Sequence, residues 1–324
     1  MKTQLTLSQA IAAYLDEAHA ERLSPHTIAD YSNSFRHLRA YLVDDRPLAA
    51  ITADDLIGFF AGLALPRSPA GIAARPSRPI GAKQALNIHT GLSALWSWAM
   101  RRGYTAHHVV HDIRRPKPER PAITPLTEGD IKAILAGCDR SIAYARRGQA
   151  ITDYTRPTAQ RDRAIILLLI DTGIRASELS ALRLLDIDLR NRTITVFGKG
   201  AKERSLPIGP ITARALARHI TGNRADAPAN APLFLGLRGE ALTRDALQKL
   251  LRRLGEQAKV SNVHPHRFRH TFAIQYLRNG GNTRALQEAL GHETLDMIRT
   301  YTRIAEADLV NGHRTASPVE NWRL

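Results

Sequence analysis

Apolar residues in the first hundred positions recur every three or four residues, a spacing that places them on one face of an α-helix. Leu7, Ile11 and Ala18 mark the first such face. Ser24 followed by Pro25 has the pattern of a helix N-cap with proline in the first turn. The pattern predicts four helices, over residues 5–23, 25–43, 52–65 and 81–102, and therefore a small helical bundle.

The second half of the chain mixes helical and β patterns. Two β-prone runs, 193–197 and 204–208, flank the glycine-containing segment 198–202, which is a hairpin signal. A polar stretch over 140–160 has no clear pattern. Helices are predicted near residues 161–172, 176–182, 210–221, 243–258, 266–279, 283–290 and 295–307. We therefore predict a mainly α fold with a small β-sheet, of the α+β class.

Prolines separate the two halves. Three of them alternate with charged residues over 114–121, where neither a helix nor a central strand can continue. The segment has the composition of an extended linker. We predict a helical domain over 1–113, a linker over 114–122 and a second domain over 123–324, which ends in a tail over about 304–324.

Charge is distributed unevenly between these parts. The chain has 324 residues and a formal net charge of +16, from 46 Lys+Arg and 30 Asp+Glu. Residues 1–113 hold 11 basic and 9 acidic residues, whereas residues 114–324 hold 35 and 21. Such an excess favours a polyanionic partner, most often a nucleic acid. The alternative is a basic surface without a polyanionic partner.

Composition excludes several other classes of protein. Hydrophobic residues make up 44% of the chain, enough to bury sizeable cores, so wholesale disorder is excluded. The longest apolar run, about residues 164–170, is too short to span a bilayer, and the first residues lack the apolar segment of a signal peptide. The single cysteine, Cys138, permits no intramolecular disulfide. We expect a cytoplasmic, nucleoid-associated protein that has no membrane partner.

Two cationic turns are candidates for phosphate chemistry. Arg175 follows Gly173, between two predicted helices, and its guanidinium can bind two phosphate oxygens at once. Glu178, one turn later, can orient that arginine through an ion pair. Lys199 lies between two glycines at the hairpin tip, where neighbouring cations would lower its pKa and make it a general acid; Lys202 is a rival for this role. Each of these residues can also be an ordinary surface residue.

A cluster of histidines and arginines lies on a later helix. His266 and Arg269 are three residues apart and share a helix face. His266 and His270, four residues apart, also have the spacing of a metal-binding pair. However, no cysteine is available to complete such a site, and Arg267 and Arg269 on either side repel a cation. We therefore expect no bound metal and no other cofactor.

A histidine and a tyrosine complete the candidates. His292 follows a helix-ending Leu290-Gly291, and Tyr301 lies nine residues later. A tyrosine nucleophile needs phosphate-binding cations beside its phenol, because a free phenol has a pKa of ~10 and is mostly protonated at neutral pH. The alternative for Tyr301 is an aromatic residue packed on a helix face.

In chain order, these candidates resemble the tyrosine recombinases of the phage integrase family. The segments that carry the resemblance are TGIRASEL (172–179), GKGAKERSLPI (198–208), HPHRFRHTFA (264–273) and LGHETLDMIRTYTR (290–303). The resemblance to the family's catalytic domain covers about residues 124–303, and the preceding bundle is similar to the family's SAM-like, DNA-binding core-binding domain. The resemblance implies such a four-helix bundle joined to a tyrosine-recombinase catalytic domain.

The resemblance also implies a role for each candidate. These roles are Arg175 and Arg269 on the non-bridging oxygens of the scissile phosphate, Lys199 as general acid for the leaving 5′-oxygen, His266 of a His-x-x-Arg motif in proton transfer from the nucleophile, His292 as a hydrogen-bonding partner of the phosphate, and Tyr301 as nucleophile. Glu178 would support the first arginine. Two features depart from the commonest pattern, the extra positive charge at Arg267 and the enlarged segment 140–160.

The implied reaction cleaves and rejoins double-stranded DNA at specific sites. It passes through a 3′-phosphotyrosyl intermediate and a Holliday junction, without ATP or metal, in a tetramer on two synapsed sites, and we expect a monomer in the absence of DNA. The C-terminal tail is expected to dock on a neighbouring protomer. Further basic residues that we expect on DNA are Arg67, Arg75, Arg78, Lys83, Lys202, Arg204 and Arg267.

Three other functions stay open at this point. A relaxing enzyme like the type IB topoisomerases shares the phosphotyrosine chemistry. A non-catalytic DNA-binding protein on the same fold has no need of Tyr301. A metal-dependent nuclease using the histidine cluster would be sensitive to EDTA.

Overall fold

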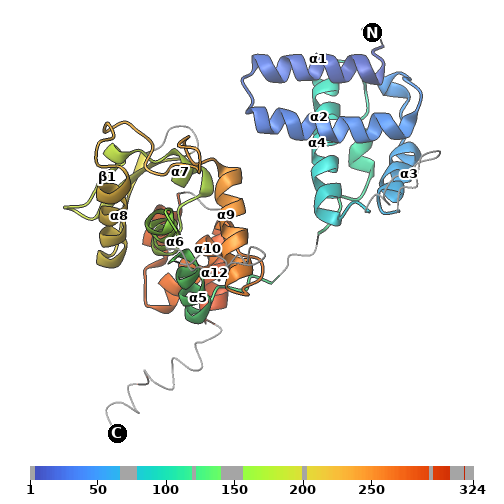
Figure 1. Cartoon of the computed structure of the whole chain (residues 1–324). Helices are drawn as coiled ribbons and strands as arrows, with labels where there is room; N and C mark the ends of the chain where they lie inside the picture. The colour runs from blue at the N-terminus through green and yellow to red at the C-terminus, as the bar shows by residue number, and fades with distance from the viewer. Residues whose placement is uncertain are drawn as a thin grey trace, which may run out of the picture. The chain divides into compact units, whose positions relative to one another are not determined.

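The structure is a computed structural model that describes residues 4–65, 79–118, 122–139, 156–198, 203–291, 295–306 and 317. The chain divides into two compact units, Met1–Pro121 and Ala122–Leu324, each with its own apolar core (Figure 1). The prediction of a mainly α fold with a small sheet is confirmed. Arg67, Arg75, Arg78, Lys199, Lys202, His292, most of the stretch 140–160 and nearly all of the tail lie outside the described residues.

The first unit is a bundle of helices. The helices are α1 (Leu7–Ala20), α2 (Pro25–Leu42), α3 (Ala53–Leu63) and α4 (Ala82–Arg101), with short 3-10 turns at Leu48–Ala50 and Val109–Asp112. Each agrees with its predicted range to within three residues at either end. The agreement is local in origin, because side chains of Thr6, Ser24 and Thr52 accept hydrogen bonds from the first turns of the helices that follow them. Large aromatic residues, among them Trp96 and Phe35, fill the core.

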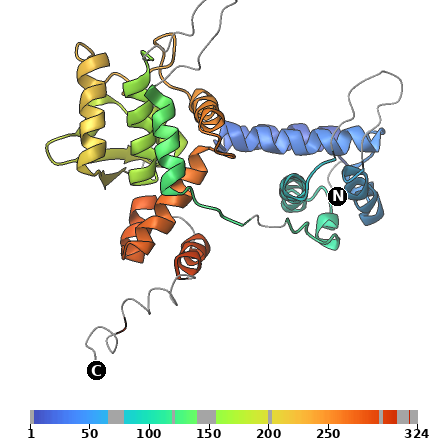
Figure 2. The ribbon, with the colours of Figure 1, turned by 60° about the horizontal axis from the view of Figure 1, so that its bottom comes forward.

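The second unit holds eight further helices among its described residues. These are α5 (Glu128–Asp139), α6 (Ala159–Thr172), α7 (Ala176–Ala181), α8 (Pro210–Asn223), α9 (Arg244–Gln257), α10 (Pro265–Arg278), α11 (Thr283–Leu290) and α12 (Leu295–Glu306), with a 3-10 turn at Leu184–Asp186. The apolar helix α6 runs through the middle of the unit and packs against α5, α8 and α10 (Figures 1 and 2).

The sheet has three antiparallel strands in the order β1-β2-β3, namely Ile187–Asp188, Thr193–Phe197 and Glu203–Pro207. The predicted hairpin is formed by β2 and β3, with Thr195 opposite Ser205. Ile194, Val196 and Leu206 are buried on one face. The short strand β1 was not predicted, because its two residues are held only by pairing with β2.

Candidate active site

The end of helix α6 contacts one of the candidate arginines. Gly173 ends α6 in a left-handed conformation with φ +60°. A Cβ at this position would lie 2.4 Å from the Phe272 ring on α10, so both the backbone conformation and the packing require glycine. The close approach lets the carbonyl of Gly173 accept a hydrogen bond from Arg269 Nη1 at 2.7 Å. A side chain here would force apart the two segments that carry the candidate arginines.

Arg175 stands at the N-cap of the next helix, α7, and is held by Glu178. Its backbone N–H donates to Glu178 Oε2 at 2.9 Å, and its Nη1 donates to Oε1 at 3.0 Å. The expected ion pair is therefore present. Its Nη2 donates to the carbonyl of Gly291 at 2.9 Å, and the side chain stays 31% exposed. Arg175 is thus fixed along most of its length while part of it faces outward.

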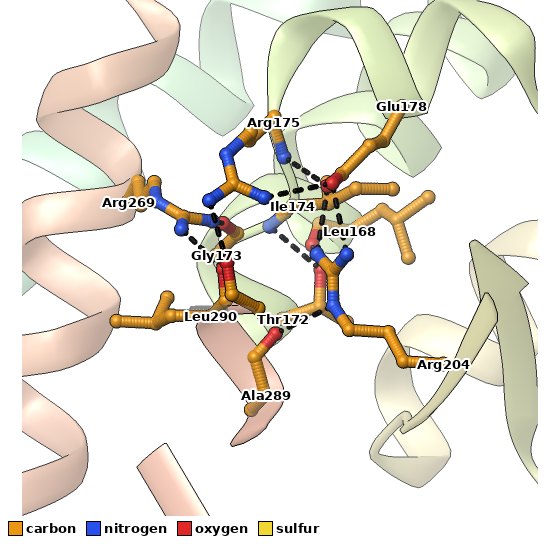
Figure 3. Close-up of polar contacts among 11 residues, drawn as sticks. Leu168, Thr172, Gly173, Ile174, Arg175, Glu178, Arg204, Arg269, Ala289 and Leu290 are labelled. Carbon is orange, nitrogen blue, oxygen red and sulfur yellow. Dashed lines mark hydrogen bonds and ion pairs between the residues drawn. The ribbon is translucent and has the colours of Figure 1, made fainter. Parts of the chain in front are cut away.

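Glu178 is itself held by a second arginine. Arg204 on β3 donates from Nη1 to Oε1 at 2.9 Å and from Nη2 to Oε2 at 2.8 Å, and its Nε donates to the carbonyl of Ala289 at 2.9 Å. Burial alone would raise the pKa of a carboxyl, but the hydrogen bonds from Arg204 and Arg175 outweigh it and hold the pKa of Glu178 below its usual range. Glu178 is therefore a buried carboxylate shared by two arginines (Figure 3).

Arg269 is the more deeply placed of the two candidate phosphate-binding arginines. It is 2% exposed and donates from Nη1 to Gly173 and from Nη2 to the carbonyl of Leu290, at 2.5 Å. Because Arg175 binds the neighbouring carbonyl of Gly291, the two guanidinium groups meet at adjacent residues at the end of α11 (Figure 3). Segments almost a hundred residues apart in sequence thus place two arginines side by side.

Tyr301 lies on α12 and is 1% exposed. Its phenolic oxygen lies 2.8 Å from Nδ1 of His270 on α10. His266, one turn earlier on α10, is exposed, and its ring centroid is 6.4 Å from that of His270. His266 and Arg269 lie on α10 and Tyr301 lies on α12, and these two helices pack together.

A cavity of about 1050 Å³ opens beside Arg175. Its lining comes from α7, the β2–β3 hairpin and α11, and includes Glu178, Arg204 and Gly291. The turn that carries Arg175 and the β2–β3 hairpin therefore line the same cavity. Both segments were predicted to take part in phosphate chemistry.

Two basic residues that we expected on DNA make contacts within the protein. All three guanidinium nitrogens of Arg204 donate to Glu178 or Ala289, so the structure shows it bracing Glu178. Arg267 donates from Nε to the carbonyl of Thr124 at 3.0 Å and from Nη1 to that of Ser261. Lys83 lies exposed in the first turn of α4. DNA contact by these three residues remains a prediction.

The contact that His270 makes was not predicted from the sequence. We considered His270 only as half of a metal-binding pair, but its Nδ1 faces Tyr301. The spacing of His270 from His266 carries no information about a partner 31 residues further along the chain.

Within the described residues, no group of three histidines, cysteines or carboxylates is arranged to hold a metal ion. No helix in that part of the chain is long and apolar enough to cross a membrane.

Comparison with known proteins connects this geometry to a family. Residues 126–308 match the model of the phage integrase family. The chain is 33% identical over 285 residues to the tyrosine recombinase XerC of Mycobacterium sp. (strain JLS), covering 86% of this chain and 92% of that protein. It is 29% identical over 315 residues to the tyrosine recombinase XerD of Pseudomonas aeruginosa, covering 95% and 97%.

Two solved structures share the fold. The Tn1549 transposon integrase in complex with circular intermediate DNA has a TM-score of 0.71 at 20% identity, over 94% of this chain and 99% of that one. A lambda integrase dimer bound to a COC' core site has a TM-score of 0.68 at 17% identity, over 93% and 78%. With more than half of its residues matched to the family model, this chain belongs to the phage integrase family of tyrosine recombinases.

Proposed function

We propose that this protein is a site-specific DNA recombinase that cleaves and rejoins strands through a covalent bond between Tyr301 and a 3′ phosphate. The observation that carries the proposal is the pair of arginines, Arg175 and Arg269, bound to adjacent carbonyls at the end of α11. Attack of a phenol on a phosphodiester places negative charge on the non-bridging oxygens, and fixed cations stabilise that charge. Glu178 keeps Arg175 oriented in the absence of substrate.

The remaining groups of the proposed reaction move protons. Lys199 protonates the leaving 5′-oxygen, His266 assists proton transfer and His292 hydrogen-bonds the phosphate. The covalent phosphotyrosine conserves the energy of the phosphodiester, so rejoining needs no ATP. Strand exchange through a Holliday junction takes place in a tetramer on two DNA sites, formed from monomers. The DNA complexes of the Tn1549 and lambda integrases support double-stranded DNA as the partner.

A nicked suicide substrate tests the proposal. Wild-type protein should form a covalent protein–DNA adduct, and Tyr301→Phe should form none while it still binds DNA. The phenylalanine variant is a close control because it removes one buried oxygen and keeps the ring. An adduct that persists in Tyr301→Phe refutes the assignment of the nucleophile. DNA binding by both proteins should weaken steeply with salt, because phosphate contacts release counterions.

Plasmid relaxation, adduct formation and sensitivity to EDTA separate the competing functions. Relaxation of a plasmid without dedicated sites would identify a topoisomerase-like enzyme. Binding without an adduct in the wild type would identify a non-catalytic DNA-binding protein. Loss of cleavage with EDTA would identify a metal-dependent nuclease, whereas the proposed reaction continues in EDTA.

A further inference from the structure

We infer that His270 accepts the phenolic proton of Tyr301 when the tyrosine attacks the phosphate, an inference that rests on the proposed function. Nδ1 of His270 lies 2.8 Å from the phenolic oxygen, within the range in which a general base takes a proton directly. The ring centroids are 5.7 Å apart and the ring planes are inclined at 55°, so the rings do not stack. The contact is made by polar atoms.

The position of His270 in the site supports this role. It follows Arg269 directly on α10, so the helix that supplies a phosphate-binding arginine also supplies a group to the nucleophile. His266 lies one turn earlier and is exposed. His270, and not His266 as the resemblance implies, is therefore the histidine of α10 in contact with the nucleophile, and we assign the phenolic proton to it.

The chemistry requires an acceptor at this point. A free phenol has a pKa of ~10 and holds its proton at neutral pH, whereas a neutral imidazole offers a basic nitrogen. As the bond between the Tyr301 oxygen and phosphorus forms, the phenolic O–H bond breaks and its proton passes to Nδ1 of His270. The bond from phosphorus to the 5′-oxygen breaks, and that oxygen takes a proton from the general acid. Rejoining returns the proton from His270 to the departing phenolate.

A simpler role for His270 is to satisfy a buried hydroxyl. Tyr301 is 1% exposed, and buried tyrosine hydroxyls are normally hydrogen-bonded. A partner of this kind needs only to form a hydrogen bond, whereas a base must also hold the proton. The two roles therefore differ in their response to a side chain that forms the hydrogen bond and is not basic.

His270→Asn makes this distinction, because the asparagine Oδ1 accepts a hydrogen bond near the place of Nδ1 but takes up no proton. We expect adduct formation on the suicide substrate to slow by about 10²- to 10³-fold in His270→Asn, the scale of general base catalysis. His270→Phe should slow by a similar factor. DNA affinity and Tm of His270→Asn should match those of the wild type, which shows that the variant is folded.

The other outcomes overturn the inference. If His270→Asn cleaves at nearly the wild-type rate and only His270→Phe is slow, His270 is a hydrogen-bond partner and not a base. If both variants cleave faster than the wild type, the contact restrains Tyr301 instead. If His270→Asn has lost its DNA affinity or its cooperative thermal transition, His270 is needed for folding, and the assignment as base is withdrawn.

A modified substrate shows which of the two proton transfers a variant has lost, the one to the leaving 5′-oxygen or the one from the phenol. Sulfur in place of the bridging 5′-oxygen leaves without protonation, so this substrate should restore cleavage in Lys199→Ala. It should not restore cleavage in His270→Asn, because that variant lacks the acceptor for the phenolic proton of Tyr301. Restored cleavage in His270→Asn would contradict the inference. Wild-type protein that forms no adduct on either substrate refutes the proposed function itself, so the two failures are distinguishable.

Discussion

Two turns of the second unit, eight residues apart, are built on the same local plan. In each, an arginine precedes a short helix and an acid follows three residues later, as Arg175 with Glu178 and Arg183 with Asp186. The backbone N–H of the arginine donates to the carboxylate, at 2.9 Å in the first turn and 2.8 Å in the second. The guanidinium pairs with the same carboxylate at 3.0 and 3.1 Å, and both acid side chains are 3% exposed.

The turns differ in what reaches them from elsewhere in the chain. Glu178 also receives Arg204 from β3, and Arg175 extends to the carbonyl of Gly291 after α11. Arg183 lies 6.0 Å from the centre of the Phe197 ring and is 42% exposed. A local motif fixes an arginine, and long-range contacts decide whether that arginine faces a site. Matched substitutions in the two turns test this conclusion.

Replacement of each arginine by lysine should give the largest difference. Arg175→Lys keeps the charge but loses the planar fork that binds two oxygens, so we expect cleavage of the suicide substrate to fall by about 10²- to 10³-fold. Arg183→Lys makes the same chemical change in the matched turn and should leave the cleavage rate unchanged. An equal loss in both variants would show that the turns share one function.

Replacing the acid of each turn by its neutral amide should give a smaller difference between the two turns, measured as the free energy of unfolding. Glu178→Gln leaves two arginines without their shared carboxylate, and breaking a buried pair costs about 3 kcal/mol in the free energy of unfolding. Asp186→Asn loosens one half-exposed arginine and should cost about 1 kcal/mol. Urea unfolding measures both. Equal costs would mean that Arg204 adds nothing to the first turn.

Much of this fold follows from local sequence. Helix ends are predicted well because caps such as Thr52 and the apolar period act within one turn. The ion pair of Arg175 with Glu178 was likewise predicted from a spacing of three residues. The pair of Arg183 with Asp186 has the same spacing but was not predicted. The sequence also does not show that only the first of the two turns receives Arg204.

The parts that were missed depend on contacts between distant segments. Strand β1 exists only through its pairing with β2. The contacts that Arg204 makes within the protein were not predicted, because they join it to Glu178, 26 residues earlier, and to Ala289, 85 residues later; its contact with DNA stays a prediction. His270 was considered beside His266, its neighbour on the helix, whereas Tyr301 lies on another helix. In each case packing of separate elements supplied the partner.

Lowering the pH should reduce the stability that the ionised Glu178 gives to the first turn. The pKa of Glu178 is lowered in the folded protein, so its ionised form adds stability above the unfolded pKa of ~4.3, and this contribution is lost as pH falls through the folded pKa. The difference in unfolding free energy between wild type and Glu178→Gln should therefore narrow below about pH 4. Unfolding curves at pH 7 and at acid pH measure it. A difference that stays constant with pH would show that Glu178 contributes shape and hydrogen bonding but not charge.

The smallest effect is expected at an ion pair that neither turn contains. Lys132 and Glu128 on α5 lie 2.6 Å apart, closer than either arginine lies to its acid in the two turns, but their side chains are 74% and 82% exposed. Solvent screens such a pair and holding two long side chains costs entropy, so Lys132→Met should leave the urea midpoint unchanged within error. A loss of stability comparable with that of Asp186→Asn would mean that distance governs these pairs. If the midpoint is unchanged, burial and the number of partners govern them; Glu178 and Asp186 are equally buried, and Glu178 has the additional partner Arg204.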